Sequence, residues 1–293
     1  MYKVLAILLV FLIFPSALSA QAASGPAAPD SGSMALAPAR FELEMQPGSE
    51  TTVVLNLDYR SAGEMTKPAR IVASLNDWTI SRDGRVEYFP ANSRPNSASS
   101  WLLYSPGEAS VLPGTVHQIR VTVSVPLDAN PGDHLAALIV EQRPNTLKHE
   151  GNYRQMIVRY RMASVFYIKV AKLTRKGNFE NLYAESTRDG IVVTPVLKNE
   201  GNSVVRPVAS VAVIDGEGKP VAEIAESETL PILGGSETSS PLVIEKSLTP
   251  GTYTVRYRVD FRDGRQATEG ETALVVRTPL QIASQKDTER KKR

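Results

Sequence analysis

The sequence predicts an all-β protein made of two β-sandwich domains in tandem. Turn-forming Pro-Gly and Asp-Gly pairs recur along the chain, because Gly tolerates positive φ and Pro or Asp favours the preceding corner. Between the pairs lie short runs of alternating apolar and polar residues, a pattern that turns every second side chain toward a core. No stretch after residue 33 carries a sustained helical repeat. Short strands at this spacing favour immunoglobulin-like sandwiches.

The turn pairs and the alternating runs together predict about seven to nine strands in a first domain and about seven in a second. Pro-Gly occurs at 47–48, 106–107, 113–114, 131–132 and 250–251, and Asp-Gly at 83–84, 189–190, 215–216 and 263–264. The clearest alternating runs cover residues 51–57, 119–125, 156–170 and 253–259.

The first 22 residues are predicted to be a cleaved signal peptide. Lys3 precedes an unbroken apolar run at residues 4–14, and an Ala-x-Ala site follows at Ala20 and Ala22. An apolar run this short is a poor membrane span and matches a secretory signal, with an uncleaved anchor helix as the alternative. Residues 23–34 are rich in Ala, Ser, Gly and Pro and are predicted to be a flexible leader. We therefore expect an exported, periplasmic protein without a membrane span.

Domain boundaries follow from length and from one change in composition. The 293 residues are enough for two domains, each with its own core. A long strand run ends in a basic, Gly-containing linker at 173–178, so the first domain is placed at 35–172 and the second at 179–277. Residues 278–293 form a polar tail with a basic end, interpreted as solvated.

Composition argues against catalysis and against several kinds of site. The chain has no Cys, which excludes thiol nucleophiles, Cys-ligated metals and disulfides. A formal charge of +2 gives no field that favours nucleic acid. The three histidines, His117, His134 and His149, lie in different segments, and no nucleophile, zinc or phosphate-loop motif occurs. We expect no enzyme activity, no cofactor and no metal; the oxygen-rich segment 128–134 is interpreted as a turn, with calcium as the alternative.

A series of short motifs runs through the first domain in the order Asn76-Asp77-Trp78, Arg82-Asp83-Gly84, Ser105-Pro106, Leu112-Pro113-Gly114, Ile119-Arg120-Val121 and Pro131-Gly132-Asp133. This series resembles the amino-terminal domain of PapD-like periplasmic chaperones of pilus assembly. The resemblance covers roughly residues 35–170. The second domain lacks the Asn-Pro-Thr-Pro segment of those chaperones. The resemblance implies two immunoglobulin-like domains and pilin-like exported subunits as partners.

The resemblance also implies site residues that bind a partner. Arg40 corresponds to the cleft arginine that grips a client's terminal carboxylate, a role that suits the paired donors of a guanidinium. The second cleft cation of the family falls on Ser164 here, so the chain departs from the pattern at that position. Lys169 and Lys172 lie close by in sequence and are retained as candidates.

The last strand of the first domain is the segment that such chaperones lend to a pilin subunit. Met156, Val158, Tyr160 and Met162 form an alternating apolar stripe there, as strand addition requires. When the strand is aligned with the family on the aromatic pair at 166–167, the family's donor positions fall on the residues between those of the stripe. Either a bulge shifts the register, or the strand packs in its own core.

We therefore predict a periplasmic chaperone-like protein that binds exported subunits by strand addition along the last strand of domain one. The alternative is a structural or adhesion module of the cell envelope, similar to peptidoglycan-associated sandwich proteins and without chaperone activity.

Overall fold

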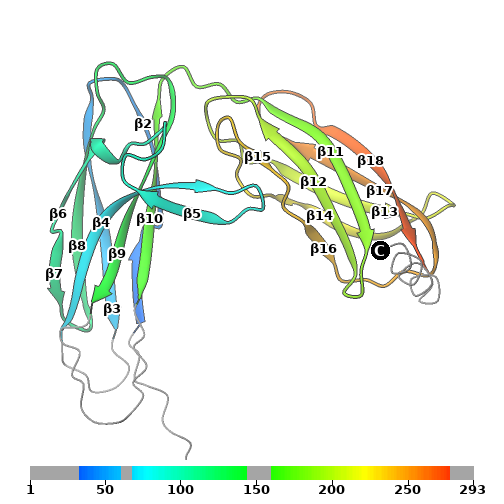
Figure 1. The fold of residues 1–293 in the computed structure, drawn as a ribbon, viewed down its shortest axis with the longest axis horizontal. Coiled ribbons are helices and arrows are strands. Elements are labelled where there is room, and N and C mark those ends of the chain that lie inside the picture. The colour runs from blue at the N-terminus through cyan, green and yellow to red at the C-terminus, as the bar shows by residue number, and fades with distance from the viewer. Residues whose placement is uncertain (1–32, 61–67, 144–159, 278–293) are drawn as a thin grey trace, which may run out of the picture.

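The computed structural model describes residues 33–60, 68–143 and 160–277 as two β-sandwiches that lie side by side (Figure 1). Residues 171–176 join them, between the last strand of the first sandwich and the first strand of the second. The predicted linker, 173–178, overlaps this segment. Strands make up both domains, and the described part of domain one adds a single 3₁₀ turn, η1 (Ser99–Trp101).

Domain one has two facing sheets, with more strands than the seven to nine predicted. The first sheet has the order β1-β3-β8-β6, and its strands are β1 (Ser33–Ala37), β3 (Glu50–Arg60), β8 (Thr115–Ser124) and β6 (Leu102–Ser105). The second has the order β2-β10-β9-β4-β5, with β7 also paired to β4. Its strands are β2 (Arg40–Met45), β10 (Arg161–Val170), β9 (Gly132–Arg143), β4 (Ala69–Ile80), β5 (Val86–Pro90) and β7 (Glu108–Val111).

The chain changes sheets between β1 and β2. β1 pairs antiparallel with β3, whereas β2 pairs parallel with the second half of β10. Pro38 lies at the change, where a residue without a backbone N–H interrupts the ladder at no cost. Phe41 of β2 then stacks on Phe166 of β10, with ring centroids 4.9 Å apart, and this contact fixes β2 on the second sheet.

The core of domain one lies between the two sheets and follows the predicted alternation. In the second half of β8 every second residue is buried, at Ile119, Val121 and Val123, and Phe166 and Ile168 of β10 face them from the other sheet. The residues between them on β8 are exposed or half-buried. Burial of these side chains is the main contribution to the stability of the sandwich.

Domain two is a second sandwich with its own core. One sheet pairs β12 (Ile191–Asn199) with β11 (Gly177–Ser186), β15 (Glu237–Thr238) and β16 (Leu242–Ile244). The other has the order β14-β13-β17-β18, with β14 (Pro220–Glu228), β13 (Val208–Ile214), β17 (Gly251–Asp260) and β18 (Thr268–Val276). Tyr257 and Val255 lie at the centre of the core, and burial raises the pKa of the Tyr257 hydroxyl far above its ordinary value.

The predicted fold class is confirmed: the described chain is all β and forms two sandwiches in tandem. In domain one the order β1-β3-β8-β6 faces the order β2-β10-β9-β4. Counted along the chain, these are strands A-B-E-D against A′-G-F-C, which is the immunoglobulin-like arrangement.

Candidate partner-binding site and domain junction

The first half of β10 is an open sheet edge. β9 pairs with β10 over its whole length, from Arg161 to Val170, but the pairing of β2 with β10 begins at Val165. Among the described residues, no strand pairs with the outer side of Arg161–Ser164. β1 lies beside this half of β10 in Figure 1, yet it pairs with β3 in the opposite sheet.

The direction of the free peptide groups follows from two hydrogen bonds. The Tyr160 carbonyl accepts from the N–H of Gln142 on β9, and the Val165 N–H donates to the carbonyl of Ala39 on the other side. Because successive peptide groups of a strand point to opposite sides, Arg161 and Ala163 direct theirs to the open edge. An incoming strand would find donors and acceptors at these two residues.

Half-buried apolar side chains lie under this edge. Met162 of β10 and Met34 and Leu36 of β1 pack against the core while remaining partly exposed. Tyr160 is also half-buried. The predicted stripe residues Met156 and Val158 lie outside the described residues. Tyr160 and Met162, the stripe residues that the structure describes, therefore lie on the same core-facing side of the strand as Phe166 and Ile168.

The carboxylate of Glu42 on β2 contacts three cations at the junction between the domains. Its Oε1 accepts from Arg206 of domain two at 2.8 Å and lies 3.1 Å from Nε of Arg40. Its Oε2 accepts from Nζ of Lys169 at 2.7 Å. Arg40, Glu42 and Lys169 share the outer face of the second sheet, opposite the core face of Phe41 and Phe166.

The Glu42 cluster is partly shielded from water. The Lys169 side chain is 8% exposed and that of Arg206 is 19% exposed, and Arg206 lies over the ring of Tyr167. Burial alone would raise the pKa of Glu42, but the hydrogen bond from Lys169 and the three positive charges hold that pKa below its ordinary value. The carboxylate is therefore ionised and links the two domains electrostatically.

The predicted cationic residues thus differ in their surroundings. Arg40 keeps a side chain that is 52% exposed, whereas the ammonium of Lys169 is buried against Glu42. Lys172 is exposed on the connecting segment, and its carbonyl accepts from Asn202 of domain two. Ser164, where the family has a cation, is buried and donates to the carbonyl of Pro38. The structure brings Arg40 and Lys169 together on one carboxylate and leaves Lys172 apart.

A second polar contact joins the start of β9 to domain two. The Asp133 N–H donates to the Asn202 carbonyl at 2.9 Å, and Asp133 Oδ2 accepts from the N–H of Val204 at 2.7 Å. Gly132 allows this approach: its φ is 127°, and a Cβ placed there would lie 2.9 Å from the Asn202 oxygen. Burial raises the pKa of Asp133.

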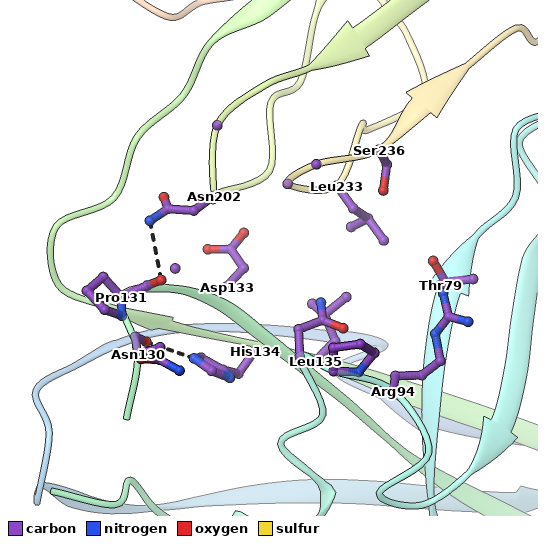
Figure 2. Close-up of a pocket in the computed structure, with 16 residues that line it drawn as sticks. Thr79, Arg94, Asn130, Pro131, Asp133, His134, Leu135, Asn202, Leu233 and Ser236 are labelled. Atoms are coloured by element: carbon purple, nitrogen blue, oxygen red, sulfur yellow. Dashed lines mark hydrogen bonds between the residues drawn. The ribbon is translucent and has the colours of Figure 1, made fainter. Parts of the chain in front are cut away.

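A pocket of about 490 Å³ lies beside this contact. Figure 2 shows Asn130–Leu135 of domain one on one side and Asn202, Leu233 and Ser236 of domain two on the other. The His134 ring lies against Trp101, and its Nε2 is 2.9 Å from the Asn130 carbonyl. These contacts account for the oxygen-rich segment as a turn, and the described residues contain no group of three metal-ligating side chains of the His, Cys, Asp or Glu type.

The hairpin formed by β4 and β5 provides a third contact between the domains. In Figure 1 it extends from domain one toward the loops of domain two. At its tip the carbonyl of Arg82 accepts from the Ser239 N–H at 2.7 Å, and the Arg82 guanidinium pairs with Glu237 at 2.6 Å. Between the hairpin and the Glu42 cluster, Trp78 packs edge-on against Tyr167, with Val204 and Leu233 of domain two in the same buried cluster.

Several of these residues carried no signal in the sequence. Glu42 follows Arg40 at the spacing of one strand face, which is a weak indication that both share a surface. Arg206 and Asn202 lie in loops of the other domain, and nothing in a single sequence links a loop residue to a strand about 160 positions earlier. Asp133 stood out only as part of a turn.

No protein-family model and no curated protein matches the chain. Solved structures of similar shape include a chaperone–tip adhesin complex of CFA/I fimbriae biogenesis, with 9% identity over 82% of this chain and 98% of the other, at a TM-score of 0.44. A complex of the SafA pilin with the SafB chaperone of Salmonella enterica has 14% identity over 85% of this chain and 99% of the other, at a TM-score of 0.41. The CsuC–CsuE chaperone–tip subunit complex of Acinetobacter baumannii has 14% identity over 83% of this chain and 98% of the other, at a TM-score of 0.39. Each of these structures contains a chaperone together with a pilin or tip subunit.

Within residues 33–60, 68–143 and 160–277, the structure has no helix with the length and hydrophobicity to cross a bilayer.

Proposed function

We propose that this protein is a periplasmic chaperone that binds an exported, pilin-like subunit by strand addition to the open edge of β10. The observation that carries the proposal is the unpaired outer side of Arg161–Ser164, next to the half-buried side chains of Met162 and Leu36. Exposed strand edges of this kind are normally covered or blunted in soluble proteins, so an edge left open over an apolar interior favours a partner strand.

Arg40 is the proposed contact for an acidic group of the partner, such as its terminal carboxylate. Its guanidinium uses Nε on Glu42 and remains half exposed, so further donors face solvent. Lys169 acts indirectly in this proposal, because it holds Glu42 and with it the orientation of Arg40. Lys172 is retained as an exposed cation at the junction. The proposed function requires no catalytic group, cofactor or metal.

The test replaces one residue of the open edge in two ways. Ala163→Pro removes the N–H that points to the edge and leaves the β9 ladder in place, because the N–H of Ala163 does not face β9. Ala163→Ser keeps the N–H and is the matched control. Each form is purified from the periplasm, and co-purifying subunits are compared with those of the unchanged protein.

We expect the unchanged protein and Ala163→Ser to retain a subunit that Ala163→Pro loses. In the isolated complex, the amides of Arg161 and Ala163 should gain protection from hydrogen exchange. A subunit that binds without protecting these two amides would refute strand addition at this edge. Absence of any co-purifying subunit would instead support the envelope-module alternative.

A further inference from the structure

A small pocket of about 220 Å³ lies between the connecting segment, domain two and the Glu42 cluster. Five charged side chains line it: Glu42, Lys169, Arg175, Arg206 and Arg262. Four of these are cations and one is a carboxylate. The surroundings of the pocket therefore have an excess of positive charge at a place where both domains meet.

The single lining carboxylate is already saturated by cations. Its Oε1 contacts Arg40 and Arg206, and its Oε2 contacts Lys169. One negative charge is thus shared among three positive ones. The cluster therefore carries a net positive charge, and two of its cations, Lys169 and Arg206, are largely buried.

The two other arginines of the pocket are weakly compensated. Arg262 is 3.6 Å from Glu228, and both side chains are more than half exposed, so water screens that pair. Arg175 is exposed and has no ion pair within the described residues. The carboxylate of Asp133 lies within electrostatic reach of Lys169 and Arg175, but it is bound to the Val204 N–H and lies outside the lining of this pocket.

Two of the cations are held in place before any ligand binds. Arg206 is fixed between Glu42 and the ring of Tyr167, and Lys169 is buried against the same carboxylate. A guanidinium has five N–H donors, and Arg206 uses one of them on Glu42 and another on the Tyr167 hydroxyl. The remaining donors belong to a rigid group, which lowers the entropic cost of binding an anion.

We propose that this pocket binds a doubly charged oxyanion, a sulfate or phosphate group, through Arg206, Arg175 and Arg262. Three arginines that line one small pocket suit the oxygens of such a group, because each guanidinium offers paired donors. The bound anion would bridge the connecting segment and domain two to the cluster on domain one. The site is separate from the open edge of β10 and does not depend on strand addition.

The test measures the thermal unfolding midpoint of the purified protein as sodium sulfate is added, with sodium chloride at equal ionic strength as the reference. A specific anion raises the midpoint with a saturating dependence on its concentration. Arg175→Gln and Arg262→Gln remove one exposed guanidinium each, so both variants should fold. Arg60→Gln, whose side chain is 75% exposed on domain one, is the matched control.

We expect a saturable rise with sulfate beyond that with chloride, and a half-saturating concentration raised about tenfold in each pocket variant but not in Arg60→Gln. Parallel titrations with inorganic phosphate and with glycerol 3-phosphate distinguish a free ion from a phosphomonoester, according to whether the second also saturates. Equal midpoints in sulfate and chloride, or pocket variants that titrate like the unchanged protein, would overturn the proposal.

Discussion

Asp77 is the residue whose replacement most directly tests how domain one holds its loop at the junction. It is 1% exposed, and it forms no ion pair with any residue that the structure describes. Its Oδ2 accepts from the N–H groups of Ser93 and Arg94 at 2.7 and 2.9 Å, and its Oδ1 accepts from the hydroxyls of Ser97 and Ser99 at 2.5 and 2.6 Å. The loop that follows β5 is therefore folded around one buried carboxylate.

Removing the carboxylate should be costly because four donors lose their acceptor at once. Hydrogen bonds to a charged group contribute about 1.5–3 kcal/mol each, and the four are not additive, so we expect Asp77→Ala to lower the free energy of unfolding by about 3–5 kcal/mol. Asp77→Asn should lose about 1–2 kcal/mol, because its oxygen can accept from the two N–H groups while its amide donates to the two hydroxyls.

The assay is urea unfolding of both variants and the unchanged protein, at neutral and at acid pH. Burial opposes ionisation of Asp77, but the bonds from Ser97, Ser99, Arg94 and Ser93 outweigh it and hold the pKa below its ordinary value of 3.8. A lowered pKa contributes stability that is complete above pH 3.8 and is lost as the pH falls through the folded-state pKa. The difference in free energy of unfolding between Asp77→Asn and the unchanged protein should therefore become smaller at acid pH. An Asp77→Ala variant within about 1 kcal/mol of the unchanged protein would refute the reasoning.

Two further predictions concern the domain junction. Gly132→Ala should lower the free energy of unfolding by about 2–3 kcal/mol, because a Cβ would meet the Asn202 oxygen and the φ of 127° is strained for alanine. Gly114→Ala is the control, with a φ of 75° and no atom within 4 Å of the added Cβ. It should lose only about 1 kcal/mol in the same urea titration. Glu42→Gln should leave the buried Lys169 without its ion-pair partner and lower the free energy of unfolding by about 2 kcal/mol. It should also loosen the domains, which small-angle scattering would detect as a broader range of shapes. Because the pKa of Glu42 is lowered, its contribution to the free energy of unfolding should disappear as the pH falls below the ordinary carboxyl range. If Glu42→Gln lost stability in acid in the same way as the unchanged protein does, this reasoning would be contradicted.

The alternation of side chains made the sandwiches predictable, since it depends only on neighbours in sequence. The run at 119–125 places Ile119, Val121 and Val123 on one face, and all three are buried in the structure. The same logic put Tyr160 and Met162 on a shared face. The pairing of β2 with β10 was not predictable, because it requires the chain to leave one sheet at Pro38 and join the other.

The junction was harder to predict than either domain, for a physical reason. Its contacts join residues far apart in the chain: Arg206 to Glu42, Val204 to Asp133, and Glu237 to Arg82. Such pairs are determined by how two completed domains meet, and local patterns carry no information about that. Sequence therefore indicated Arg40 and Lys169 as cations of interest without indicating the carboxylate that they share.

The unequal pairing of β10 also has a mechanical consequence. A force that pulls on the strand along its length loads the hydrogen bonds with β9 together, in shear, rather than one after another. From Val165 to Val170 the bonds with β2 share that load, whereas from Arg161 to Ser164 β9 is the one strand, among the described residues, whose ladder bears it. A partner strand that completed the open edge would distribute tension over both flanks. The strand would then resist extraction most strongly while it is occupied.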